Sequence, residues 1–266
     1  MLSDLRFSLR LLVKTPGFTL AAIIVLALGI GVNTAIFSLV HELVFSPRPW
    51  PDEKQVVQLY TQDEKKPEQF RMFSYPVFKQ LQQQQTGFTG IMAHNLTMIG
   101  VGDGETARRT FGALVSSNYF HTLQVRLIRG RDFLPAEEKP GAAEQVTIVS
   151  YNFWKRLGSP ADMVGRVLRI NERPFTVVGI APEGFSGTMM LFGPELYFPL
   201  GCYDLLNNDF GAEQKHSLRE EDAYNLVLVG RLQPGQTIAT ATPGLKMLST
   251  QLKSGHPVSF KDQTLT

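Results

Sequence analysis

The chain has 266 residues, of which 43% are hydrophobic and 19% are charged, a composition that excludes a disordered or low-complexity protein and leaves room for one large or two small folded domains. Its single cysteine, Cys202, excludes an intrachain disulfide and a cysteine-rich metal site, and no motif indicates a cofactor. The net charge of +2 excludes a strongly basic nucleic-acid-binding protein, so we expect no nucleic-acid partner.

Residues 1–14 are predicted to form a short amphipathic helix on the cytoplasmic surface of a membrane. Arg6, Arg10 and Lys14 are spaced four apart on one helical face, and leucines occupy the other face. This pattern suits an anionic lipid surface. Together with Asp4 these cations account for the whole net charge, because the remaining 252 residues hold 23 basic and 23 acidic side chains. A helical leader with no membrane role is the alternative.

Residues 15–42 are predicted to form a transmembrane helix, because no charged residue occurs from Thr15 to Val40 and about 20 apolar residues span a bilayer core. A cleaved signal peptide is the alternative, but its apolar core is usually about 7–15 residues long and ends at a small-residue cleavage site, which is not clear here. Three cations precede the span and only Arg48 follows it soon after. We therefore expect the N-terminus in the cytoplasm, the span in a bacterial inner membrane, and the residues after about 42 in the periplasm.

Within this span, Ala27, Gly31 and Ala35 form a small-xxx-small stripe, with Asn33 and Thr34 next to it. Small residues let helices approach closely, and an asparagine in hydrocarbon requires a polar partner. A lone anchor that faces only lipid needs neither feature. We therefore expect Ala27, Gly31, Asn33 and Ala35 to pack against other membrane helices.

Beyond the proline-rich segment 47–51, short strands alternate with short helices without a repeating βαβ period, which predicts an α+β domain over residues 50–254. Strands are expected at 55–61, 88–101, 110–115, 146–150, 167–170, 175–180, 195–200 and 224–232, and helical segments at 74–85, 117–123, 151–157 and 236–253. Turns are expected at Gly102-Asp103-Gly104 and around Asn171-Pro174, the latter closing the clearest hairpin in the chain. Residues 255–266 are expected to form an exposed tail.

The sequence shows no motif for catalysis. It has no G-x-x-x-x-G-K-[ST] phosphate-binding loop, and the segment that begins with His41-Glu42 has Phe45 where a zinc protease has its second histidine. The segment 184–187 does not fit a nucleophile elbow. Cys202 is expected to be packed, and the charged pairs and runs at 137–138 and 219–222 are expected to be solvated. Surface or packing roles are expected for the scattered histidines, which are His94, His121, His216 and His256.

Several segments, taken in order, resemble a known family. They include residues 1–40, the run Ser74-Tyr75-Pro76, and the longer runs at 112–120, 130–133, 150–154, 164–166 and 175–185, and the strand at 224–232 followed by Gln233-Pro234-Gly235 extends the match. Together they are similar to the duplicated orphan permeases described in acidobacteria, which are relatives of the MacB-type ABC exporters. Each segment alone is a weak signal, but their shared order is specific.

The resemblance implies a MacB-like periplasmic core domain after the helix, with a porter-like α+β part and an inserted, mostly β part. It also implies a non-catalytic permease subunit that works with a separate cytoplasmic ATPase and carries its motion to the periplasmic domain. In the family three more membrane helices follow, and the whole unit can occur twice. This sequence shows no second apolar run, so we expect either a fragment of a longer permease or a truncated single-span subunit whose partners are further permease helices or a second permease copy.

Two other functions remain open from the sequence. One is a single-pass, membrane-anchored module for binding or adhesion, which would co-purify with no ATPase. The other is an anchored extracytoplasmic hydrolase, which would need a nucleophile and base that the sequence does not show.

Overall fold

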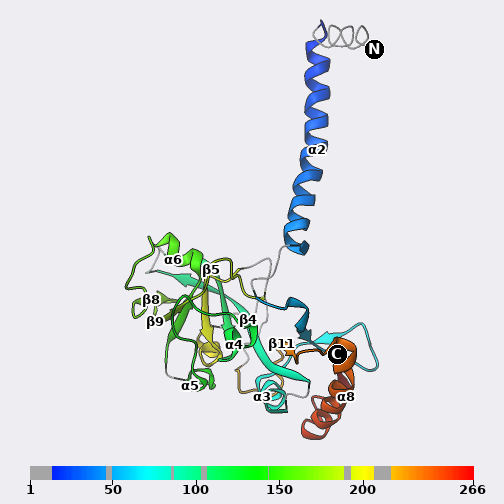
Figure 1. The fold of residues 1–266 in the computed structure, drawn as a ribbon, viewed down its shortest axis with the longest axis vertical. Coiled ribbons are helices and arrows are strands. Elements are labelled where there is room, and N and C mark those ends of the chain that lie inside the picture. The colour runs from blue at the N-terminus through cyan, green and yellow to red at the C-terminus, as the bar shows by residue number, and fades with distance from the viewer. Residues whose placement is uncertain are drawn as a thin grey trace. The chain divides into compact units, whose positions relative to one another are not determined.

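The computed structural model describes residues 14–45, 50–84, 87–102, 107–142, 144–188, 193–206 and 217–266. The chain divides into two compact units, Met1–Pro47 and Arg48–Thr266 (Figure 1). The first unit contains one long apolar helix, and the second has mixed α and β structure, as the sequence predicted.

Helix α2 runs from Pro16 to Phe45 without a break. Pro16 lies in its first turn, where a missing backbone N–H costs nothing. Residues Pro16–Ser38 are long and apolar enough to cross a membrane, and none of that segment is buried within the chain. The apolar helix predicted at 15–42 is therefore present, and at 1.5 Å per residue it is about 45 Å long. Of the amphipathic segment predicted at 1–14, all but Lys14 lies outside the described residues.

The second unit is built on a nine-stranded mixed sheet with the order β1-β11-β4-β5-β10-β7-β9-β6, in which β8 pairs with β4 and β9. Neighbours are antiparallel except for the parallel pairs β5–β10 and β7–β9. Strands β7 and β10 are buried at every position, because side chains cover both faces of the sheet there. The strands are β1 Val56–Leu59, β4 Phe88–Val101, β5 Arg108–Val115, β6 Arg129–Gly130, β7 Val146–Val149, β8 Val167–Ile170, β9 Arg173–Ile180, β10 Leu196–Pro199 and β11 Val227–Leu232.

Most of these strands match the expected ones, but the strand expected at 55–61 is divided. Strand β1 pairs with β11 in the large sheet, whereas β2 (Thr61–Asp63) pairs with β3 (Phe70–Arg71) and β12 (Gln263–Leu265) in a three-stranded sheet. Tyr60 lies between them and exchanges backbone hydrogen bonds with Thr266 at 3.0 and 2.9 Å. The chain therefore passes from one sheet to the other at Tyr60.

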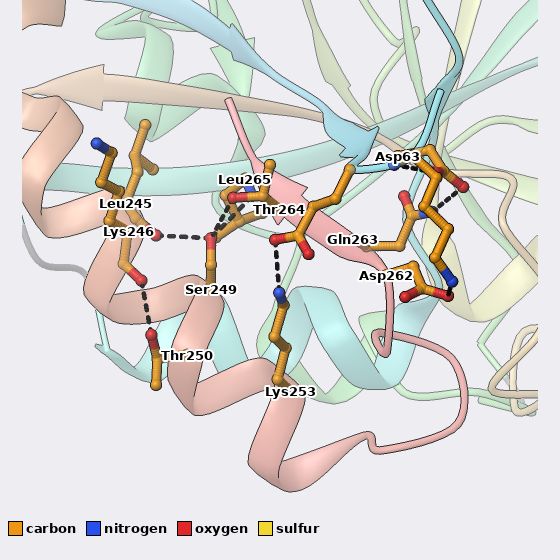
Figure 2. A network of polar contacts seen from close by, with 12 residues as sticks. Asp63, Leu245, Lys246, Ser249, Thr250, Lys253, Asp262, Gln263, Thr264 and Leu265 are labelled. Carbon is orange, nitrogen blue, oxygen red and sulfur yellow. Dashed lines mark hydrogen bonds and ion pairs between the residues drawn. The ribbon is translucent and has the colours of Figure 1, made fainter. Parts of the chain in front are cut away.

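The exposed tail expected at 255–266 was wrong. Phe260 and Leu265 are buried, β12 pairs with β2, and Leu265 N–H donates to Ser249 Oγ at 2.8 Å. Figure 2 shows Ser249, Leu265 and Asp262 in this network. Asp262 also forms an ion pair with Lys65 at 2.8 Å. The polar composition of the segment suggested solvent exposure, but backbone pairing and two apolar anchors hold it on the domain.

The helices flank the sheet, and two of them start at caps visible in the sequence. Ser150 Oγ accepts the N–H of Phe153 at 3.2 Å, and Thr237 Oγ1 accepts that of Thr240 at 3.3 Å. Helix α8 continues through Pro243, and Figure 1 shows it (orange-red) beside α3 (cyan). The helical elements are η1 Glu53–Gln55, α3 Tyr75–Gln84, α4 Tyr119–Leu123, α5 Pro135–Glu138, α6 Tyr151–Arg156, η3 Leu200–Cys202, α7 Tyr203–Leu206 and α8 Ile238–Gly255.

Two hydrophobic clusters form the core. The larger contains residues of α3, α7 and α8 together with one set of strand residues, including Phe78, Phe198 and Leu248. The smaller contains Trp50 and residues of α4, including Leu123. Trp50 therefore fixes the first described residues of this unit to its core.

Candidate functional site

The predicted helix-packing residues lie exposed on α2. Ala27, Gly31 and Ala35 are spaced four apart on one face, and among the described residues a Cβ added at Gly31 would meet no atom within 4 Å beyond its chain neighbours and the helix's own backbone. Asn33 is not part of this face, because two residues of an α-helix correspond to about 200° of rotation. The sequence placed Asn33 next to the stripe, and helix geometry corrects this to the opposite side. The helix thus presents two separate features that suit contact with other helices.

Of the basic residues predicted to contact a membrane surface, Lys14 is exposed, and Arg6 and Arg10 lie outside the described residues. The Asp103-Gly104 turn and His216 lie outside them as well.

No group of three or more metal-ligating side chains occurs within the described part of the chain. Cys202 is buried as expected, and burial raises the pKa of its thiol to about 12, so it remains protonated and poorly nucleophilic. His121 is exposed, and His256 Nε2 lies 2.9 Å from Gln80 Oε1. These side chains do not assemble into a catalytic pair.

His94 is buried in a polar chain that includes Tyr119 and Thr188. Thr188 N–H donates to the hydroxyl of Tyr119 at 3.1 Å, and the two hydroxyls are 3.3 Å apart. Thr188 Oγ1 lies 3.0 Å from Nε2 of His94. Burial lowers the pKa of His94 to about 4, so the imidazole is neutral and its Nε2 can accept the Thr188 hydroxyl.

The pair Glu137-Glu138 was expected to be solvated, and this was wrong. Glu138 accepts the N–H and the hydroxyl of Ser117 at 2.7 and 2.6 Å and pairs with Lys79 at 3.0 Å. Glu137 pairs with Arg131 at 2.6 Å. Both carboxylates are at most 3% exposed, and their hydrogen bonds offset the cost of burial. Residues 219–222, by contrast, are exposed as expected.

A cleft lined by described residues of the second unit has a volume of ≈ 670 Å³. Ligand sites commonly have volumes of about 300–1,000 Å³. The cleft is formed by the start of the unit, the end of α4 and the loop after it, β6, and the end of β11. Its lining side chains include Gln55, His121, Thr122, Arg126, Asp132 and Arg231.

Arg231 is the most unusual of these side chains, because it is only 2% exposed and its guanidinium donates hydrogen bonds to backbone carbonyls. Its Nε donates to Thr122 O at 2.6 Å, and Nη2 donates to Leu123 O at 3.1 Å. Both Nη atoms lie 3.2 Å from Pro51 O. Burial lowers the pKa of the guanidinium, and Asp52 nearby partly offsets this. The carbonyls at the C-terminal end of α4 suit a cation, because they lack helical partners.

The buried ionic roles of Arg231, Glu137 and Glu138 were not predicted from the sequence. Arg231 has a visible signal, since it is the only charge in the apolar run 226–232 and a charge in a buried strand requires partners. The two glutamates follow Pro135 in a short helix, with no comparable signal in their neighbours.

The sequence profile of the family described as the MacB-like periplasmic core domain matches residues 19–247. Among curated proteins no match was found. Several solved structures share the fold at low identity, and three of them are described here. A domain of a protein from Porphyromonas gingivalis described as a permease has a TM-score of 0.56 and 16% identity, covering 82% of this chain and 92% of that one.

The periplasmic region of MacB from Actinobacillus actinomycetemcomitans has a TM-score of 0.54 and 13% identity, covering 85% and 93% of the two chains. The extracellular domain of the noncanonic ABC-type transporter YknZ from Gram-positive bacteria has a TM-score of 0.53 and 14% identity, covering 79% and 99%. At such identities these three likenesses concern the fold.

Proposed function

The chain belongs to the family of ABC transporter permeases with a MacB-like periplasmic core domain, and on that premise we propose that it is a non-catalytic permease subunit that couples a separate cytoplasmic ATPase to its outer domain. The coupling serves export or the transmission of motion across the inner membrane. One observation carries this proposal: the family match begins at residue 19, inside α2, and continues to residue 247, inside α8. The apolar helix and the second unit, Arg48–Thr266, here called the outer unit or outer domain, are therefore parts of one family module.

The sequence supports the division of labour with an ATPase. The 266 residues contain no phosphate-binding loop, which supports hydrolysis of ATP by a separate subunit. The cations at Arg6, Arg10 and Lys14 support an N-terminus on the cytoplasmic side, where that ATPase would act. The residues after about 42 are then periplasmic.

The exposed faces of α2 support assembly with other membrane helices. The stripe of Ala27, Gly31 and Ala35 allows close approach of one helix. Asn33, on the other side, suits a hydrogen bond with a second helix. We assign these helices to further permease segments or to a second permease copy.

Co-isolation from membranes of the source organism tests the proposal. The protein is tagged at its outer domain, captured in mild detergent, and its partners are identified by mass spectrometry and assayed for ATP hydrolysis. We expect a nucleotide-binding subunit and vanadate-sensitive hydrolysis in the wild-type eluate. Capture of the intact protein with no ATPase would contradict the proposal and favour a single-pass binding module, which the ≈ 670 Å³ cleft would suit.

A further inference from the structure

Arg231 lies at a junction of three parts of the outer unit. Its backbone belongs to β11, between β1 and β4, where it is opposite Val56 on one side and Gly90 on the other. Its guanidinium reaches two further segments, the carbonyl of Pro51 and the carbonyls at the end of α4. A single side chain thus joins the sheet, the start of the unit and one wall of the cleft.

The start of the unit, residues 50–55, is here called the lead-in segment. It is the first described part of the chain after α2, which ends at Phe45. The segment turns at Asp52, whose φ of 51° lies in the left-handed region, and Gln55 N–H closes the turn on Asp52 O at 2.8 Å. Trp50 is buried at one end, and Pro51 and Gln55 line the cleft.

The cleft wall that Arg231 holds is the end of α4 and the loop after it. Thr122, Gln124 and Val125 line the cleft, and Gln124 leaves the helix with a φ of 57°. The hydroxyl of Thr122 is buried and has no hydrogen-bond partner among the described residues. The hydrogen bonds from Arg231 to Thr122 O and Leu123 O therefore hold this wall of the cleft to β11.

A buried guanidinium that is bound to carbonyls is a costly arrangement, because hydrogen bonds to neutral acceptors and the nearby Asp52 offset the desolvation of the charge only in part. The planar guanidinium can bind several acceptors at fixed angles, which the ammonium of a lysine cannot do. Arg231 uses this geometry to bridge two segments that lie about 70 residues apart along the chain.

We propose that Arg231 is a positioning residue that couples the lead-in segment to the cleft wall, so that displacement of the chain at Pro51 changes the cleft between α4 and β11. The inference rests on the proposed function, in which motion reaches the outer domain through α2. The motion would enter the domain at the lead-in segment, and the cleft wall would respond to it.

Hydrogen–deuterium exchange on the full chain in lipid nanodiscs tests the coupling. Arg231→Met keeps the apolar stem but removes all the carbonyl bonds. We expect exchange in peptides covering 52–59 and 119–127 to rise about tenfold or more, as loss of hydrogen bonds to a charged group implies, while peptides of α8 keep their wild-type exchange. Arg126→Met, an exposed arginine of the same cleft, serves as the matched control and should change neither region.

A double-mutant cycle tests whether Arg231 couples the lead-in segment to the cleft wall or only stabilises each of them locally. Asp52→Val strains the lead-in segment, because a β-branched residue disfavours a positive φ, and Asp52→Asn is its control, because asparagine tolerates that region. With Arg231 present, Asp52→Val should speed exchange at 119–127. In the Arg231→Met background it should add nothing there, because the link is already absent.

Equal acceleration of α8 in Arg231→Met, or additive effects at 119–127 in the cycle, would overturn the proposal and leave Arg231 with a general structural role. If Arg231→Met does not fold, Arg231→Lys replaces it and should uncouple the two segments in the same way, since one ammonium cannot hold both sets of carbonyls. The assay uses this chain alone. Its failure is therefore distinguishable from failure of the permease assignment, which rests on co-isolation of an ATPase.

Discussion

The Thr188 hydroxyl lies 3.0 Å from Nε2 of buried His94, so the imidazole must be neutral for this hydroxyl to donate to it. In the folded protein the pKa of His94 is about 4, whereas an unfolded histidine titrates near 6.5. Between these values the unfolded chain binds a proton that the folded chain does not. Stability from this group is therefore present above about pH 6.5 and is lost as the pH falls towards 4.

We expect the free energy of unfolding to fall between pH 7 and pH 4 by roughly 3 kcal/mol through His94. His94→Gln should flatten this part of the pH profile. Urea unfolding of the protein at a series of pH values measures the slope. An unchanged slope in His94→Gln would contradict the role given to His94.

The second prediction concerns the buried carboxylate Glu138. Glu138→Ala should lower the free energy of unfolding by about 3 kcal/mol, because it removes the acceptor of the N–H and hydroxyl of Ser117 and the partner of Lys79. Glu138→Gln should cost less, since its amide oxygen can still accept from Ser117. Chemical denaturation measures both, with exposed Glu183→Ala as a control expected within about 0.5 kcal/mol of wild type. Equal stability of Glu138→Ala and Glu183→Ala would show that the network contributes nothing.

The third prediction concerns the C-terminal strand. Ser249→Ala removes the acceptor of Leu265 N–H and should cost about 1–3 kcal/mol, because it leaves a buried donor unsatisfied. Thr250→Ala is the matched control on the same helix, since its hydroxyl bonds only to Lys246 O on the exposed side (Figure 2). Amide exchange of residues 260–266 should rise in Ser249→Ala and remain unchanged in Thr250→Ala. Rapid exchange of this segment in the wild type would argue against the packing of β12.

Elements stabilised by local contacts could be predicted from the sequence, whereas those stabilised by contacts with distant residues could not. The hairpin of β8 and β9 and the long strand β4 were predictable, because alternation of side chains and local turn residues determine them. Strand β12 was not, because its three residues pair with β2 some 200 positions earlier. Likewise Glu138 was not predicted to be buried, because its partners Ser117 and Lys79 are distant in the sequence.

The site was less predictable than the fold for the same reason. Arg231 reads as one charge in an apolar strand, and its function depends on carbonyls at positions 51, 122 and 123, which no local pattern brings together. The small-residue stripe of α2 was visible in the sequence, because a helix places residues four apart on one face.

The fourth prediction concerns that stripe. Gly31→Leu should weaken detergent-stable association with partner helices without unfolding the outer domain, because a bulky side chain prevents close helix approach. Val32→Leu is the control, since Val32 lies about 100° away around the helix. Size-exclusion chromatography measures association, and circular dichroism monitors the outer domain. Equal association of the two variants would exclude Gly31 from an interface.

Site-specific cross-linking in native membranes tests directly whether α2 packs against other helices of a transporter. Single cysteines are placed at Gly31→Cys and Val32→Cys in a Cys202→Ala background, and a short bifunctional maleimide captures neighbours for mass spectrometry. We expect Gly31→Cys to cross-link to a permease helix in complexes that also contain a nucleotide-binding subunit, and Val32→Cys to do so far less. Intact protein that cross-links at neither position, in membranes where the ATPase is present, would contradict this packing.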